Sequence, residues 1–415
     1  MPAPSTVQNM RKKHEKIGLW MVGAAGGVAS TVALGIAALR KGLADTTGLV
    51  SALPPFDHLG LVAPGSITVG GHEVRPVGIL DTVQHLRDRA NLFTEELVRK
   101  CTPTLRSFQK NIRPGTLYGS SAVIRKLVGD SIDPRDLSPA AAIERLAADI
   151  VEFRRTNNLD RVVVIHLASS EPIATKAAAH ASYAKLQRSL AKKGSRVLPA
   201  SSLYALAAID AGCPFVNFTP SLGIAVPAIR QRADEMGVCY MGSDGKTGET
   251  LVKSVLAPLF AMRNLRVLSW VGQNILGNHD GQALRDPKAR LAKIRSKDKS
   301  VTPIVGGSPT THVSIDFVPS LDDWKVAWDF IHFQGFLETK MSMQFTWQGS
   351  DSILAAPLVI DLARFAAHEH RTGRGGAMRH LACFFKDPLD VRKYDQISQW
   401  RMLLDHFDPS SVGQP

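Results

Sequence analysis

KIGLWMVGAAGGVASTVALGIAALRK, from Lys16 to Lys41, is a stretch that carries no charge between Ile17 and Leu39. It has three interpretations: a membrane helix, a signal peptide, or a strand, turn and helix that bind a nucleotide. A membrane helix needs about 20 apolar residues, but glycine, serine and threonine make up about a third of this run. A signal peptide ends at a small-residue cleavage site, and AAL before Arg40 is a poor match.

The glycines favour the nucleotide-binding interpretation. A strand over Ile17–Val22 that stops at glycines and opens into a helix over Ser30–Arg40 would direct backbone N–H groups at a phosphate. The usual spacing is G-x-G-x-x-G, and this turn departs from it, because it reads Gly23-x-Ala25-Gly26-x-x-Ala29 with alanines at Ala25 and Ala29. The turn alone therefore leaves the three interpretations open.

The remainder of the chain indicates the fold class. Strand-like runs at 160–168, 213–219 and 237–243 alternate with helical patterns, which predicts a doubly wound parallel sheet. Runs at 312–318 and 340–347 alternate between apolar and polar residues, as in an antiparallel sheet covered on one face. We therefore predict a Rossmann-like α/β fold interrupted by a smaller α+β catalytic and oligomerisation domain. The expected parts are a flexible N-terminus 1–15, a Rossmann-like domain 16–242, the α+β domain 243–352, and a return to the first domain with a tail, 353–415.

Composition narrows the class of partner. The 415-residue chain has a formal net charge of +13, which favours a nucleic acid, a membrane surface or a phosphorylated metabolite. Its basic residues are scattered apart from the run 285–299, and no nucleic-acid-binding motif is present, so we predict a small phosphorylated molecule and neither nucleic acid nor membrane. The four cysteines lie far apart without a CxxC pair, which fits a reducing cytoplasm.

Four segments resemble one enzyme family, in order along the chain. GSDGKTGETLVKSVLAPLFAMRNLRVLSWVGQNILGNHDG (242–281) is similar to the family pattern GDDxKSGQTxxKSV followed by a strand and YNHLGNNDG. DSILAAPLVIDL (351–362), PASSLYALAAIDAGCPFVNFTPS (199–221) and LDRVVVIHLASSEP (159–172) match three more of its segments. From about Gly18 to Leu389, the chain resembles the myo-inositol-1-phosphate synthase family.

The resemblance implies an NAD-dependent cyclase that converts D-glucose 6-phosphate to 1D-myo-inositol 3-phosphate. C5 is oxidised by bound NAD, the C6 enolate attacks the C1 aldehyde, and the hydride is then returned, so no net redox occurs. It also implies a homotetramer joined through the smaller domain, and an activating cation that is either ammonium or a divalent metal ion.

The resemblance further implies the residues that act. The reaction builds negative charge beside a permanent phosphate, and lysines in a desolvated site stabilise such charge and exchange protons. Lys293 would accept the proton of the C5 hydroxyl, and other lysines would stabilise the enolate and aldol oxygens. Aspartates would orient these lysines. The catalytic positions matched are Lys293, Lys297, Lys325, Lys386, Asp280 and Asp351.

Two further sets follow from the same resemblance. Glu73 would accept hydrogen bonds from the adenosine ribose, and Ala168 and Ser169 would flank the nicotinamide. The matched cofactor positions are Gly23, Ala25, Gly26, Gly27, Glu73, Ala168, Ser169 and Asp244. The positions that would hold the substrate phosphate are Thr247, Gly248, Asn278 and Lys297.

Departures from the family pattern leave alternatives open. Glu249 replaces a glutamine near the expected phosphate, and a carboxylate facing a phosphate is repulsive. Either Glu249 points away, or lysines or a metal offset it, or the substrate differs. A cyclase acting on another sugar phosphate and a non-catalytic NAD-binding homologue therefore stay open. HEH at 368–370 is interpreted as structural, and a metal would use phosphate oxygens and Asp280.

Overall fold

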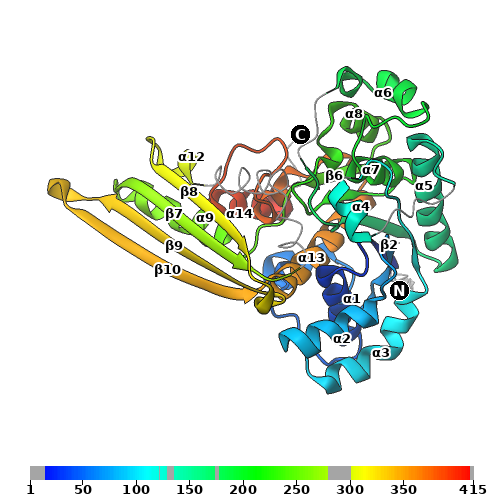
Figure 1. Ribbon diagram of the computed structural model, residues 1–415, viewed down its shortest axis with the longest axis horizontal. Coiled ribbons are helices and arrows are strands. Elements are labelled where there is room, and N and C mark those ends of the chain that lie inside the picture. Colours follow the sequence, from blue (N-terminus) through cyan, green and yellow to red (C-terminus); the bar gives the residue numbers. More distant parts are fainter. Residues whose placement is uncertain (1–14, 121, 129–134, 173–176, 279–300, 412–415) are drawn as a thin grey trace, which may run out of the picture.

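The computed structural model describes residues 15–120, 122–128, 135–172, 177–278 and 301–411, and Figure 1 shows a helix-covered sheet from which a second sheet projects. All strand pairs of the larger sheet are parallel. Its seven strands, in order across the sheet, are β11 (Gly376–Ala377), β6 (Cys239–Gly242), β5 (Phe215–Asn217), β4 (Arg161–His166), β1 (Ile17–Val22), β2 (Thr68–Glu73) and β3 (Ile112–Pro114). This is the dinucleotide-binding strand order, which reverses between β1 and β4.

Helices cover both faces of this sheet because its strands are apolar on both sides. Leu19 and Met21 of β1 face one core, whereas Trp20 and Val22 face the other. Helices of the first core are α1 (Gly27–Arg40), α2 (Ile79–Ala90), α3 (Glu95–Gln109), α13 (Asp351–Arg371) and α14 (Gln396–Phe407). Helices of the second core are α5 (Pro139–Thr156), α6 (Tyr183–Leu190), α7 (Ala200–Asp210) and α8 (Pro227–Glu235).

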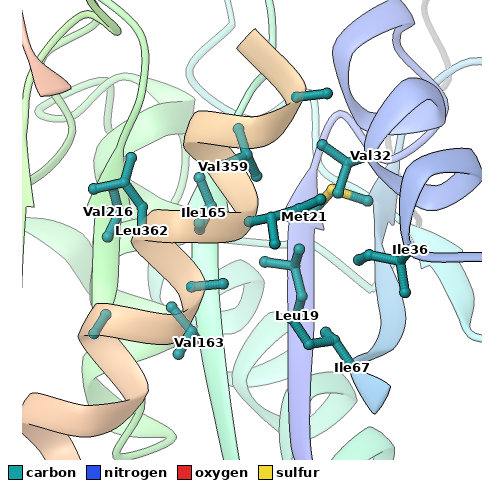
Figure 2. Close-up of a cluster of buried hydrophobic side chains, with 14 of the residues drawn as sticks. Leu19, Met21, Val32, Ile36, Ile67, Val163, Ile165, Val216, Val359 and Leu362 are labelled. Atoms are coloured by element: carbon teal, nitrogen blue, oxygen red, sulfur yellow. The ribbon is translucent and has the colours of Figure 1, made fainter. Parts of the chain in front are cut away.

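Figure 2 shows how the first core joins distant parts of the chain. Val359 and Leu362 of α13 lie over Val163 and Ile165 of β4, beside Met21 of β1. Fully burying one such aliphatic side chain contributes about 1.5–3 kcal/mol. Helix α13, near the end of the chain, therefore covers one face of the sheet that contains β1, its first strand.

The opening stretch is thus a strand, a glycine turn and a helix. The predicted strand Ile17–Val22 is confirmed, and the helix predicted from Ser30 begins earlier, at Gly27. Within the described ranges, no helix combines the length and the apolar character needed to cross a bilayer. The predicted fold class is confirmed.

The second sheet has four strands in the order β10-β9-β7-β8. They are β7 (Arg266–Leu276), β8 (Thr310–Phe317), β9 (Trp324–Gln334) and β10 (Lys340–Ser350). The prediction of an antiparallel sheet was wrong in one pair, because β8 runs parallel to β7 and the sheet is mixed. A parallel neighbour requires a long crossover, and residues 277–309 connect these two strands. Helix α9 (Gly248–Met262) and the short α12 (Thr302–Val305) pack with this sheet.

Three local features complete the description. The segment 80–101 belongs to two helices, because Asn91 ends α2 in a left-handed conformation (φ +53°) and Thr94 caps α3. The stretch 371–379 contributes β11 to the sheet edge. Ser138 is the N-cap of α5, since its side chain accepts a hydrogen bond from the Ala141 N–H. A seven-residue helix, α4 (Ala122–Val128), precedes α5.

Candidate active site

The turn after β1 presents backbone N–H groups at the carboxyl edge of the parallel sheet. Gly23 has φ +83°, and a Cβ there would lie 3.0 Å from the Ala168 Cα, so glycine is required. Among the described residues, no side chain caps Gly26, the N-cap of α1. The first-turn N–H groups of α1, beginning at Gly27, are therefore suited to an anion. Ser169 follows Ala168 beyond the end of β4.

Glu73 ends β2 and lies beneath this turn. Its Oε2 accepts hydrogen bonds from the Ala25 N–H (2.9 Å) and from Nη2 of Arg75 (3.1 Å). The side chain is 4% exposed. An open cavity of about 740 Å³ adjoins it, and Arg106 and Arg113 are among its lining residues. The structure thus brings Glu73 to the predicted cofactor turn, with Arg75 as its partner.

Two buried lysines are paired with aspartates. Lys325, near the start of β9, has its Nζ 3.5 Å from Oδ1 of Asp351, the first residue of α13. Lys386 has its Nζ 3.0 Å from Oδ1 of Asp244. Both lysines are more than nine-tenths buried, so each carries its charge in a desolvated place where it acts strongly on nearby negative charge.

Backbone hydrogen bonds hold the second pair in place. Asp244 follows β6 and adopts a left-handed conformation, with φ +61°. The Lys386 N–H donates to the Asp244 carbonyl oxygen (2.7 Å), and the Lys246 N–H donates to that of Phe384 (2.8 Å). Because β6 is parallel to β1 and β4, this pair lies at the same edge of the sheet as the glycine turn.

Asp323 and Ser352 join the glycine turn to the first pair. Ser352 Oγ donates to Asp323 Oδ1 (2.7 Å), and the Ser352 N–H donates to Oδ2 (3.2 Å). A Cβ at Gly27 would lie 2.7 Å from Ser352 Oγ, so α1 and α13 meet at this point. Since Ser352 follows Asp351 and Asp323 is two residues from Lys325, the contact places that pair beside the turn.

The N-terminus of α9 carries two of the positions predicted to hold the substrate phosphate, Thr247 and Gly248. Thr247 is its N-cap, with no side-chain cap among the described residues, and Gly248 has φ +55°. A Cβ at Gly248 would lie 3.3 Å from Nε1 of Trp347, a buried donor with no hydrogen-bond partner in the described part of the chain. The tryptophan was not predicted from the sequence. Asn278 is half-buried after β7, and Gly277 packs against the backbone of Asp322.

Glu249, in the first turn of α9, is turned into the second sheet. Its Oε1 lies 2.5 Å from Nζ of Lys253, which is also 3.0 Å from Oδ1 of Asp329. Burial alone would lower the pKa of Lys253, but the two carboxylates outweigh it and raise that pKa. Burial also raises the pKa of Asp329 to about 6. Lys253 therefore offsets the negative charge of Glu249. This is one of the three outcomes that the sequence left open.

Sequence reasoning missed further residues at this edge of the sheet. Asp323 could have been noticed, because two aspartates in a row precede Trp324. Trp347 could not, because no local sequence pattern indicates that β10 packs beside α9. Lys246 also went unnoticed, although it lies in the GSDGKTGET loop. Its Nζ donates to Gln396 of α14 (3.0 Å), and burial lowers its pKa to about 8.

The remaining predicted residues are not tested by this geometry. Asp280, Lys293 and Lys297 lie outside the described residues. The described part of the site comprises the glycine turn, the two buried Lys–Asp pairs and the N-terminus of α9.

Comparisons with known proteins match one enzyme family over most of the chain. The family model of myo-inositol-1-phosphate synthase matches residues 17–406. Inositol-3-phosphate synthase 1 of Bacteroides thetaiotaomicron is 31% identical over 419 residues, covering 95% of this chain and 96% of that protein. Inositol-3-phosphate synthase of Dictyostelium discoideum is 26% identical, covering 86% of this chain and 75% of that protein.

Solved structures show the same fold. The inositol-3-phosphate synthase of Caenorhabditis elegans superposes with a TM-score of 0.84 at 23% identity, covering 95% of this chain and 86% of that one. A myo-inositol-1-phosphate synthase-related protein from Thermotoga maritima gives 0.75 at 22% identity, covering 95% and 98%. Because the family match runs from β1 into α14, the chain belongs to the myo-inositol-1-phosphate synthase family of NAD-binding enzymes.

Proposed function

We propose that this enzyme converts D-glucose 6-phosphate to 1D-myo-inositol 3-phosphate, with oxidation at C5, enolisation, aldol closure and re-reduction on one site. The observation that carries the proposal is the pair of buried Lys–Asp contacts, Lys325–Asp351 and Lys386–Asp244, beside the glycine turn. A chemistry that creates an enolate and alkoxides needs such desolvated cations.

The residues of the turn fit the cofactor. Close packing of Gly23 on Ala168 and the uncapped start of α1 support a pyrophosphate over this turn. Glu73 and the adjoining cavity, with Arg75 as its partner, would hold the adenosine half. When bound, NAD supplies the acceptor and later the donor of the C5 hydride.

Each lysine would act on a different oxygen of the sugar. Lys293 accepts the C5 hydroxyl proton as that carbon is oxidised. Lys325, held by Asp351, and Lys386, held by Asp244, stabilise the enolate and the aldol oxygen. Asp280 and Asp351 orient the lysines.

The substrate phosphate would bind at the start of α9. Thr247, Gly248 and the Trp347 Nε1–H supply donors there, together with Asn278 and Lys297. Because Glu249 is paired with Lys253, its carboxylate does not oppose this phosphate as an isolated charge. That pairing removes the charge conflict that gave a reason to expect a different substrate. An ammonium or divalent cation would complete the charge balance.

A product assay tests the proposal. Purified enzyme is incubated with NAD and glucose 6-phosphate, with and without ammonium or a divalent ion, and products are followed by phosphorus NMR. We expect an inositol phosphate signal. If the enzyme binds NAD but forms no inositol phosphate from glucose 6-phosphate, the substrate assignment fails. The same assay with other hexose phosphates then separates a cyclase of different substrate, which converts one of them, from a non-catalytic homologue, which converts none.

We also propose a homotetramer that works in the cytoplasm. The second sheet projects from the molecule with β10 at its edge, and Phe336 and Leu337 at its tip are 87% and 80% exposed (Figure 1). These two residues lie in the turn between β9 and β10. An open sheet edge and large exposed apolar side chains are each typical of an assembly interface. The four cysteines are buried free thiols, as a reducing compartment allows.

A further inference from the structure

Three side chains from separate segments meet at the C-terminal end of α13, away from the Lys–Asp pairs. Glu369 lies in the last turn of α13, His380 in the 3₁₀-helix η8 (Arg379–Phe384), and His406 in the last turn of α14. One potential ligand atom from each lies within 4.8 Å of the other two. The HEH stretch therefore contributes its glutamate, and neither of its histidines, to this cluster.

The cluster contains an unsatisfied buried imidazole nitrogen. His380 is 8% exposed, and its Nε2 has no hydrogen-bond partner in the described part of the chain. That nitrogen lies 4.0 Å from Oε1 of Glu369, which is 3.1 Å from Nε2 of His406. A buried polar atom without a partner costs about 1–3 kcal/mol, so a ligand that engages it would recover this cost.

We propose that Glu369, His380 and His406 form a site for a divalent transition metal ion, with Zn²⁺ the best match. Two imidazoles and one carboxylate, with water in the fourth position, are a known zinc ligand set. Zinc bonds of about 2.0–2.2 Å in a tetrahedral arrangement place ligand atoms about 3.3 Å apart. The two measured separations, 3.1 and 4.0 Å, bracket that value.

Rotation of the imidazole rings would complete the site. The rings of His380 and His406 are stacked, with centroids 3.6 Å apart and planes 2° from parallel. A metal lies in the plane of each imidazole that binds it, so the rings must turn out of this stacked arrangement. His406 has the greater freedom to turn because its side chain is 28% exposed.

Arg374 is the competitor for the same position. Its Nη1 lies 3.0 Å from Nε2 of His406 and 3.6 Å from Oε1 of Glu369. The side chain is 46% exposed, so it can move into solvent when a cation binds. Arg374 therefore weakens the site without blocking it, which makes a gain-of-affinity test available.

Cobalt titration tests the site. Tag-free enzyme is stripped with a chelator and titrated with Co²⁺, with visible absorption as the readout, and its Zn²⁺ content is measured by mass spectrometry after reloading. We expect one ion per chain, at least tenfold weaker binding in His380→Ala and His406→Ala, and tighter binding in Arg374→Gln. His85→Ala, which removes an exposed histidine of α2, should bind as the wild type does.

Two results would overturn the proposal. One is a lack of stoichiometric binding in both the wild type and Arg374→Gln. Both proteins keep all three ligands, so this result does not depend on whether a ligand variant folds. The other is equal binding by the wild type and the folded His380→Ala and His406→Ala variants, with folding checked by circular dichroism.

Discussion

At the scale of single residues, the charges buried beneath the second sheet are matched locally. Lys253 is 3% exposed and contacts both Glu249 and Asp329, while the Trp270 Nε1–H donates to the same Asp329 oxygen at 2.8 Å. The Lys253–Glu249 pair has the i, i+4 spacing that a sequence reveals. Asp329 arrives from another strand, so the full charge balance was not predictable.

Removing the lysine from this cluster should be costly. Lys253→Met leaves two buried carboxylates without their cation, and we expect the free energy of unfolding to fall by about 3–5 kcal/mol. Chemical denaturation measures it. Lys100→Met is the matched control, because the Lys100–Glu96 pair is exposed to solvent. Its loss should leave the free energy of unfolding equal to that of the wild type within error. Equal effects of the two changes would contradict the charge balance described for Glu249.

Glu171 gives the stability a defined pH dependence. Burial raises its pKa from 4.5 to about 6, against hydrogen bonds from Ser201 that lower it. The folded state thus holds the proton more tightly, so this stabilisation is complete below pH 4.5 and is lost as pH rises to about 6. Relative to Glu171→Gln, the wild type should lose about 2 kcal/mol over that interval. A difference independent of pH, measured by urea unfolding, would contradict this.

At the scale of elements, the site depends on how α1 meets α13. The two helices are more than 300 residues apart in the chain, yet Gly27 lies against Ser352 and Asp323. This contact explains why the glycine turn and the Lys325–Asp351 pair share one end of the sheet. It also makes the packing of these helices sensitive to a single methyl group.

Two glycines of α1 should therefore respond in opposite directions to alanine. At Gly27 the Cβ would lie 2.7 Å from Ser352 Oγ, so Gly27→Ala should cost about 1–3 kcal/mol and reduce turnover. At Gly35 it would lie 3.9 Å from Ile360 Cδ1, so Gly35→Ala should stabilise by about 0.5–1 kcal/mol. Thermal unfolding of the two variants compares them; stabilisation by both would argue against the close contact at Gly27.

Some elements of the site could be predicted from the sequence and others could not. β1 and the glycine turn follow from local apolar and glycine patterns, and the Lys–Asp pairs involve positions that the family resemblance singled out. The parallel pairing of β8 with β7 and the position of Trp347 Nε1 at α9 were missed. Both depend on contacts between segments far apart in the chain, for which no local periodicity gives a signal.

At the scale of the whole molecule, the projecting second sheet is the surface to test for assembly. Phe336→Glu combined with Leu337→Glu places charge where both side chains are exposed, so we expect a mass below that of the wild type in light scattering. Leu137→Glu, at another position that is 66% exposed, should leave the mass unchanged. A wild-type mass equal to one chain would contradict the proposed homotetramer.

The proposed reaction is a redox cycle that begins and ends on one enzyme with no net change. Its most direct test uses glucose 6-phosphate deuterated at C5, with excess unlabelled NADH in solution, and mass spectrometry of the inositol phosphate formed. We predict that the product keeps the deuterium, and that Lys325→Met and Lys386→Met form no product while retaining NAD. Loss of the label to solution NADH, or undiminished product from both variants, would contradict the account.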